Sequence, residues 1–218
     1  MKRLTKDASG LDAAAYRALA RLSTPVKVQD FLDSLPMNFE RKGETLQSPA
    51  RVLTSRTAHC FEGALLAAAA LWIHGEPPLL LDLTVRSGSG DEDHVVALYK
   101  RGGCWGAISK TNHAALRFRD PVYRTVRELA LSYFHEWFLD STGEKTLRGY
   151  GRPFNLAKIG ASWISAAEDL WSIDRALARA KHLPLFPRNN ARFIRRADAM
   201  ERRAGALTEW DARGRKTR

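Results

Sequence analysis

The longest apolar stretch of the chain predicts a buried helix. Almost every residue from Phe61 to Ile73 is apolar, and most are Ala or Leu, which have the highest helix propensities. Thr57 is placed to cap the N-terminus, and Gly75, followed by Pro77, is placed to end the helix. A helix that is apolar on all sides packs inside a core. We therefore expect the rest of the fold to be organised around this helix.

Three short segments after this helix have the composition of β-strands. They are residues 79–86, 94–99 and 104–109, which are rich in apolar and β-branched or aromatic residues. A Ser-, Gly- and Asp-rich loop separates the first two, and a turn containing two glycines separates the second from the third. Such short connections join antiparallel strands. The sequence therefore predicts a small antiparallel sheet beside the buried helix.

Apolar residues at three- and four-residue spacing predict further helices on both sides of this centre. The segments concerned are residues 11–22, 30–35, 125–139, 161–181 and 192–207. Residues 36–47 and the Gly- and Pro-rich residues 147–155 are expected to be loops, and residues 116–124 a basic and aromatic connector. The pattern predicts an α+β fold. A chain of 218 residues fills one core better than two, so we expect a single domain spanning residues 1–218.

Cys60 stands in the first turn of the buried helix, a position that favours chemistry at sulfur. Free N–H groups and the positive end of the helix dipole lower the pKa of a thiol there, and the thiolate is the nucleophile of acyl transfer. His94 opens the second strand, and a cysteine on a helix with a histidine on the first residue of a hairpin strand is the layout that a thiol–imidazole pair needs. His59 adjoins Cys60, but a neighbour in sequence at a helix start would point elsewhere. The alternative is that Cys60 is an inert core residue, the commoner role of a free cysteine.

The order of these features resembles the transglutaminase-like superfamily of papain-like cysteine enzymes. The resemblance covers residues 25–115, including segments 28–32 and 48–58 before the helix, and is carried mainly by Cys60, Gly75, Pro77, His94 and Trp105. It implies a papain-like core in which the nucleophile helix packs on a small antiparallel sheet. Outside that core we expect a helical extension at residues 116–187 and a basic helix and tail at residues 188–218.

The resemblance also implies roles for individual residues. Cys60 would attack an amide or peptide carbonyl, its backbone N–H would help to hold the oxyanion, and His94 would take up and return the proton. The acyl-enzyme would pass to water in a protease or amidase, or to an amine in a cross-linking enzyme. Calcium, which some animal relatives need, is not implied, because no acidic loop has calcium-ligand spacing.

The third member of the site departs from the family. Relatives usually place an aspartate a few positions after the tryptophan, and Ser109 stands at that position here. We favour Asn112 as the substitute, because an amide can hold an imidazole in one tautomer and orientation; Asp120 is a more distant alternative. It is equally open that residues 109–113 only form a turn. The missing aspartate also leaves room for a catalytically inactive binding or scaffold module with the same fold.

Charge supports a competing hypothesis. The chain has a net charge of +11, and residues 188–218 hold ten Arg and Lys against four Asp and Glu, which is more than half of the excess. Such a segment attracts phosphate, as in a basic nucleic-acid-binding protein or a protein with an acidic partner. The aromatic residues, however, have core-like helical spacing and do not alternate with basic ones, a pattern that favours a solvated basic face.

The sequence implies no cofactor and no metal, because no cluster of His, Cys, Asp or Glu has metal-ligand spacing. The longest apolar run, residues 64–73, is too short to span a bilayer, and the charged N-terminus has no signal-peptide core. We therefore expect a cytoplasmic protein without membrane contact, acting on a peptide or protein substrate. In a reducing cytoplasm Cys60 and Cys104 would stay unpaired, and Cys104, at the hairpin turn, would be a spectator.

Overall fold

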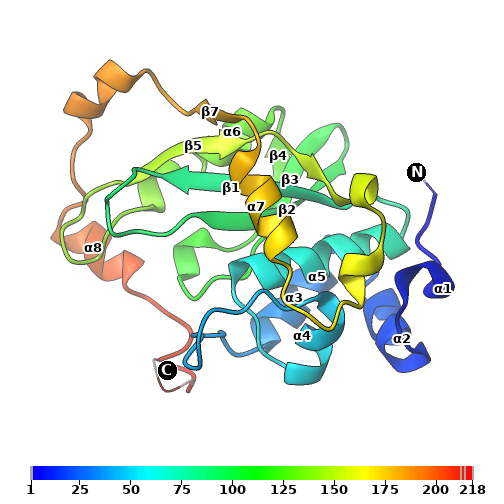
Figure 1. The fold of residues 1–218 in the computed structure, drawn as a ribbon. Coiled ribbons are helices and arrows are strands. Elements are labelled where there is room, and N and C mark those ends of the chain that lie inside the picture. The colour runs from blue at the N-terminus through cyan, green and yellow to red at the C-terminus, as the bar shows by residue number, and fades with distance from the viewer. Residues whose placement is uncertain (1, 212, 214, 218) are drawn as a thin grey trace.

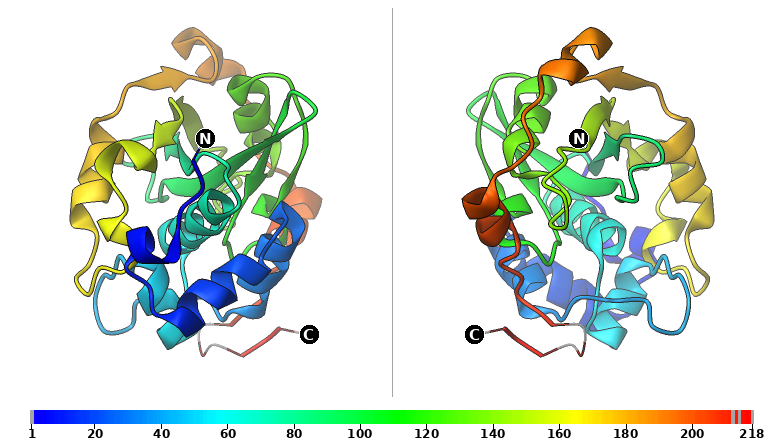
Figure 2. Two further views of the ribbon diagram at one scale, coloured as in Figure 1. Left: turned by 90° about the vertical axis from the view of Figure 1, so that its right-hand side faces the viewer. Right: turned by 90° about the vertical axis from the view of Figure 1, so that its left-hand side faces the viewer.

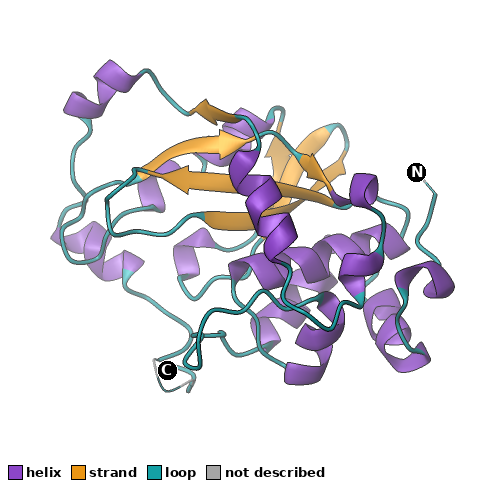
Figure 3. Cartoon of the chain, viewed as in Figure 1, coloured by secondary structure: helices purple, strands orange, loops and turns teal. Residues whose placement is uncertain are grey.

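The computed structural model describes residues 2–211, 213 and 215–217. Within these residues the chain has a mixed α+β fold, as the sequence predicted, built on a seven-stranded antiparallel sheet (Figures 1 and 3). The strand order is β4-β3-β2-β1-β5-β7, and β6 pairs with β1. The strands are β1 (Leu79–Val85), β2 (His94–Arg101), β3 (Cys104–Ile108), β4 (Arg119–Tyr123), β5 (Leu147–Gly151), β6 (Phe154–Asn155) and β7 (His182–Pro184).

The helices of the N-terminal half gather on one face of this sheet (Figures 1 and 2). They are α1 (Lys6–Ser9), α2 (Ala13–Arg21), α3 (Pro25–Ser34), α4 (Pro49–Ser55) and α5 (Cys60–Ile73). Later in the chain come α6 (Val126–Leu131), α7 (Trp171–Arg179) and α8 (Ala199–Gly205). Short 3-10 turns lie between them: η1 (Ala114–Leu116), η2 (Phe134–Glu136), η3 (Leu156–Ile159), η4 (Ser162–Ile164) and η5 (Arg188–Phe193).

Helix α5 forms the centre of the larger core. All of its residues from Phe61 to Leu71 are buried, because α2, α3 and α4 pack around it and β1 and β2 lie across it. Gly75 ends it in a left-handed conformation with φ 88°, as predicted. The cap at the other end was predicted wrongly: it is His59 and not Thr57. Ala58 bridges to Met37 in an extended conformation, so the helix cannot begin earlier.

A second apolar cluster covers the opposite face of the sheet. Alternate residues of β1 and β2, such as Leu81 and Val96, pack there against Leu129 and Ala130 of α6 and against Tyr133. Both faces of the central strands are therefore buried, which explains why these strands are almost continuously apolar. The cluster fixes the end of β2 from which His94 projects.

The segment after residue 116 was predicted wrongly as a helical extension. The expected connector contains the edge strand β4, and the expected loop at residues 147–155 supplies β5 and β6, which both pair with β1. Glycine permits this pairing, since a Cβ on Gly149 would lie 2.7 Å from Thr84 Oγ1. These residues complete the central sheet.

The helices predicted in this half are also shorter than expected. Residues 125–139, 161–181 and 192–207 contain only α6, α7 and α8 with 3-10 or irregular turns. Before α7 the chain is tied to the segment around α4, because Asp169 Oδ1 accepts from the Leu46 N–H at 2.9 Å and from Arg51 at 2.6 Å. Hydrogen bonds of this kind cannot be predicted from the spacing of apolar residues. None of the described helices is long and apolar enough to cross a membrane.

Candidate active site

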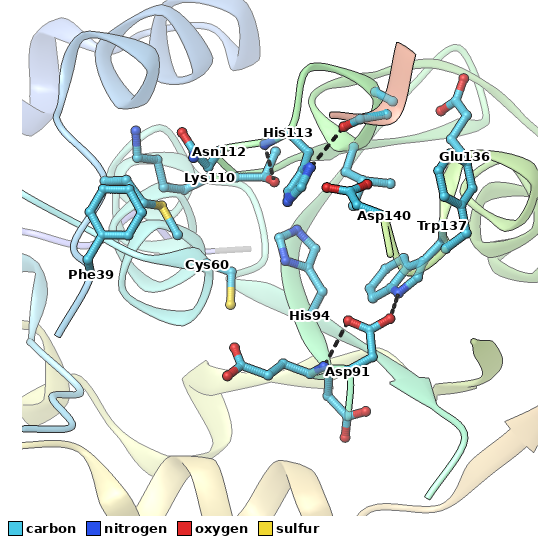
Figure 4. Close-up of a pocket in the computed structure, with 18 residues that line it drawn as sticks. Phe39, Cys60, Asp91, His94, Lys110, Asn112, His113, Glu136, Trp137 and Asp140 are labelled. Carbon is cyan, nitrogen blue, oxygen red and sulfur yellow. Dashed lines mark hydrogen bonds between the residues drawn. The ribbon is translucent and has the colours of Figure 1, made fainter. Parts of the chain in front are cut away.

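Cys60 lies where two cavities meet at the N-terminus of α5. The first, of about 290 Å³, is shown in Figure 4 and has walls from the loop before β2, the chain after β3 and the chain after α6. The second, of about 360 Å³, lies between residues 40–46, the sheet and α7. Cys60 is half-buried and lines both cavities. A ligand in either cavity would therefore lie beside the thiol.

His94 projects from the first position of β2 into the first cavity, beside Cys60 (Figure 4). Its ring is buried and packs edge-on against Trp137, with ring centroids 5.8 Å apart. Its Nε2 lies 2.7 Å from the hydroxyl oxygen of Ser109. Because Nε2 is engaged there, Nδ1 is the ring nitrogen left for the sulfur. The structure thus brings together the two residues that the sequence singled out.

Ser109 follows β3 and is fully buried. Its N–H donates to Gln29 Oε1 at 3.0 Å, and its carbonyl accepts from Gln29 Nε2 at 2.9 Å. Gln29 lies on α3, so a helix side chain binds the Ser109 backbone much as a neighbouring strand would. This clamp fixes the hydroxyl against His94. Sequence reasoning missed Gln29, because it lies 80 positions before its partner.

Asn112 lines the first cavity, but its amide is engaged elsewhere. Its Nδ2 donates to the Trp210 carbonyl and its Oδ1 accepts from the Trp210 N–H, both at 2.8 Å. Asn112 therefore holds the C-terminal segment, and the hydrogen bond to the His94 ring comes from Ser109. Asp120 lies on the edge strand β4 and is exposed. Of the residues considered for the third position, only Ser109 contacts the imidazole.

His59 is a second imidazole at Cys60, against the expectation that it would point elsewhere. Its Nε2 lies 2.8 Å from the Thr45 carbonyl and 3.4 Å from a carboxylate oxygen of Glu62. Burial lowers the pKa of His59, but hydrogen bonding and charge attraction from Cys60, together with the Glu62 charge, raise it to about 9. An imidazolium therefore adjoins the sulfur at neutral pH. The signal in the sequence was Glu62, three residues after His59, as in a capping box.

The thiol of Cys60 is correspondingly acidic. Burial raises its pKa, but hydrogen bonding and charge attraction from His59 and His94 outweigh this and hold the pKa well below the usual range. The helix N-terminus acts in the same direction. Among the described residues, none accepts the backbone N–H of Cys60. That N–H is free to bind an oxygen atom that develops negative charge next to the sulfur.

Glu62 connects the loop before α4 to the first turn of α5 through hydrogen bonds. Its carboxylate is fully buried and accepts from Thr45 Oγ1 at 2.9 Å, from the Gln47 N–H at 3.0 Å and from the His59 N–H at 3.0 Å. Asn38 donates to the same carboxylate. The loop between α3 and α4 is thereby fixed against the first turn of α5, which holds His59 in place.

Cys104 opens β3 away from both cavities and is a free thiol. In the described part of the chain, no three His, Cys, Asp or Glu side chains converge as they would around a metal ion. No protein-family model matches the chain, and no curated protein sequence matches it either.

Proposed function

We propose that the protein is a transglutaminase-like cysteine enzyme that acts on an amide or peptide bond. The observation that carries this proposal is the acidic thiol at a helix N-terminus beside His94, whose Nε2 is held by Ser109. A nucleophile, a base and an orienting group in contact are the parts that acyl transfer requires. The nucleophile helix packed on an antiparallel sheet, with the histidine at a strand start, also agrees with a papain-like core.

The proposed reaction has two steps. In the first, the Cys60 thiolate attacks the carbonyl carbon, the C–N bond breaks, and protonated His94 gives its proton to the departing amine. The Cys60 N–H stabilises the oxyanion of the tetrahedral intermediate. In the second, water or an amine attacks the thioester, gives a proton to His94, and releases the thiolate. Before the attack, protonated His59 stabilises the Cys60 thiolate by its charge.

A peptide mixture tests this proposal even though the substrate is unidentified. Wild-type protein is incubated with a proteome-derived peptide library and a labelled primary amine, and mass spectrometry then detects new peptide ends, converted carboxamides and amine adducts. We expect at least one product class, absent from Cys60→Ala and His94→Ala. Products that persist in Cys60→Ala, or none at all with folded wild-type protein, would overturn the proposal.

An inactive binding module is the second candidate, and Ser109 is the observation that favours it. A neutral hydroxyl stabilises an imidazolium less than a carboxylate does. In this candidate Cys60 and His94 therefore keep their arrangement but no longer catalyse a reaction. In that case the library experiment gives no products, and the Cys60→Ala variant keeps any peptide binding of the wild type.

The basic segment supports a separate candidate, nucleic-acid binding. Turn η5 projects from the body of the molecule (Figure 1) and carries Phe193, whose side chain is 72% exposed, next to Arg192. An exposed aromatic ring among arginines suits stacking on single-stranded bases. Salt-dependent binding of an oligonucleotide that is lost in Phe193→Ala would support this candidate; binding that does not change in this variant would contradict it.

A further inference from the structure

The cavities at Cys60 carry the opposite charge to the chain as a whole. The chain has a net charge of +11. The described residues that line the second cavity nevertheless include no Lys or Arg and six acidic residues, namely Glu40, Glu44, Asp82, Glu92, Asp93 and Asp174. Around the first cavity there are five acidic residues and, among the described residues, one Lys and no Arg. Among the described residues, the lining of both cavities therefore holds more Asp and Glu than Lys and Arg, although the chain as a whole is basic.

Some of the carboxylates at these cavities are already paired. Glu136 pairs with Arg119 at 2.7 Å, and Glu40 lies 3.7 Å from Nε2 of His59. Lys110 is fully buried and its Nζ donates to the carbonyls of Leu32 and Leu35, at 2.9 and 2.5 Å. Asp82 pairs with His182 at 2.8 Å. By contrast, Glu44 and Asp174 form no ion pair with any described residue. Their charges act on whatever enters the second cavity.

An aromatic side chain lines the same cavity as Glu44 and Asp174. Trp171 opens α7, lines the second cavity and is 38% exposed, although a large apolar side chain normally packs inside. Asp174 lies three positions further along the same helix and therefore on the same side. An exposed indole next to carboxylates is an arrangement that binds ammonium and guanidinium groups, through cation–π attraction and charge. It is an observation independent of the acidic cluster.

We propose that the Cys60 site selects a peptide with a Lys or Arg side chain next to the reacting amide. That side chain would occupy the second cavity between Trp171, Asp174 and Glu44, and its neighbouring carbonyl would meet Cys60. Acidic walls also raise the local concentration of cations and repel anions. The peptide preference rests on the proposed function, whereas the charge preference of the cleft can be measured on its own.

Two thiol reagents that differ in charge measure the field at Cys60. They are trimethylammonioethyl methanethiosulfonate and sulfonatoethyl methanethiosulfonate, whose sulfur forms a disulfide with the thiolate as methanesulfinate leaves. The rates of reaction with Cys60 are measured in a Cys104→Ser background. The ratio of the cationic to the anionic rate is then divided by the same ratio for the small uncharged thiol 2-mercaptoethanol. We expect the cationic reagent to be favoured about tenfold at low salt, falling as salt increases. The positive net charge of the chain would by itself favour the anionic reagent. A preference for the cationic reagent would therefore show that the local charge at Cys60 is negative.

Single substitutions locate the source of that field. Asp174→Asn and Glu44→Gln should each reduce the ratio about two- to threefold. Glu168→Gln, an exposed carboxylate just before α7 and outside both cavities, is the matched control and should leave the ratio unchanged. A ratio of one or below, or an equal effect of the control, would overturn the charge inference.

Peptide electrophiles test the peptide preference. Peptidyl acyloxymethyl ketones with Arg, norleucine or Glu next to the reactive group should label Cys60 in that order of rate, and Trp171→Ala should narrow the difference. Fast labelling by iodoacetamide together with equal rates for all three peptides would overturn this inference and leave the proposed function standing. Slow labelling by every reagent would overturn the proposed function, while the methanethiosulfonate ratio would still decide the charge of the cleft.

Discussion

Ser109 holds the His94 ring through a single hydroxyl, at 2.7 Å from Nε2. It sits in the position that the sequence marked for the third member of the site, whereas the favoured substitute, Asn112, holds Trp210. The two residues can be distinguished because their hydrogen bonds lead to different parts of the molecule. Of the two, only Ser109 is placed to orient the imidazole.

Ser109→Ala should slow the alkylation of Cys60 by iodoacetamide about three- to tenfold near neutral pH, because the His94 ring loses a hydrogen bond of about 1 kcal/mol. Asn112→Ala should leave the rate unchanged and loosen the C-terminal segment. Mass spectrometry of both variants, alkylated for increasing times, makes the comparison. If Asn112→Ala slowed the alkylation of Cys60 more than Ser109→Ala did, Asn112 and not Ser109 would be the residue that orients His94.

The Cys60–His59 pair predicts how stability depends on pH. In the folded protein the pKa of Cys60 is low and that of His59 is about 9, so the pair holds one proton at neutral pH. Unfolded, with pKa values of about 8.5 and 6.5, it also holds one proton between these values. Below about pH 6.5 the unfolded chain binds more protons, and above about 8.5 fewer, so this contribution to stability falls on both sides.

Urea unfolding from pH 5 to 9.5 measures this effect. The wild type should be most stable between about pH 6.5 and 8.5, and the maximum should flatten in Cys60→Ser, because the serine hydroxyl does not ionise and the pKa of His59 falls once the thiolate is gone. A pH profile identical in both proteins would contradict the ion pair.

At the scale of elements, the candidate site is formed by side chains from α3, from α5 and from the ends of two strands. Helix α5 places Cys60, the start of β2 places His94, and α3 places Ser109 through Gln29. Gln29→Leu keeps the size of the side chain but leaves the Ser109 N–H and carbonyl without partners. We expect a loss of about 1–3 kcal/mol in the free energy of unfolding and slower alkylation of Cys60.

Asp30→Asn is the matched control for Gln29→Leu, since it alters a polar residue one position along on the exposed side of α3. It should change stability by less than about 0.5 kcal/mol. The two variants are compared by urea unfolding and by the alkylation rate. Equal behaviour of both would show that the clamp on Ser109 does not support the site.

Local composition predicted the helix and the three strands at the centre of the fold. It failed for elements and side chains whose structure depends on partners distant in sequence. Helix α5 and strands β1 to β3 are dense in apolar residues, so their pattern sufficed. Strand β5 is rich in glycine, and it is a strand because it pairs with β1 on one side and with β7 on the other. Cys60 and His94 could be found from the sequence, because Cys60 begins a predicted helix and His94 begins a predicted strand. Ser109 could be found because it stands at the position, after the tryptophan, where the resembled family usually has an aspartate. Gln29 could not, since its role depends on a contact 80 residues away.

At the scale of the whole molecule, the basic C-terminal segment contrasts with the acidic lining of the two cavities at Cys60. The basic C-terminal segment returns to the wall of the first cavity, where the Ala114 N–H donates to the Leu207 carbonyl at 3.0 Å and Arg117 pairs with Glu209. Arg202 donates to the carbonyls of Asp140 and Ser141. These contacts secure the segment on the outside of an acidic site. The segment thus reaches the wall of the first cavity through Gly205 but adds no described Arg or Lys to the lining.

The pH dependence of Cys60 alkylation tests the central claim most directly. In a Cys104→Ser background, the rate of reaction with iodoacetamide is measured from pH 4 to 10 by mass spectrometry, in the parent and in His94→Ala, His59→Asn and the double variant. We predict a midpoint well below about 8.5 in the parent, a higher one in each single variant, and a value of about 8.5 or above in the double variant, where burial no longer has the two imidazoles against it. A midpoint near 8.5 in all four proteins, or labelling only on unfolding, would contradict an activated thiol.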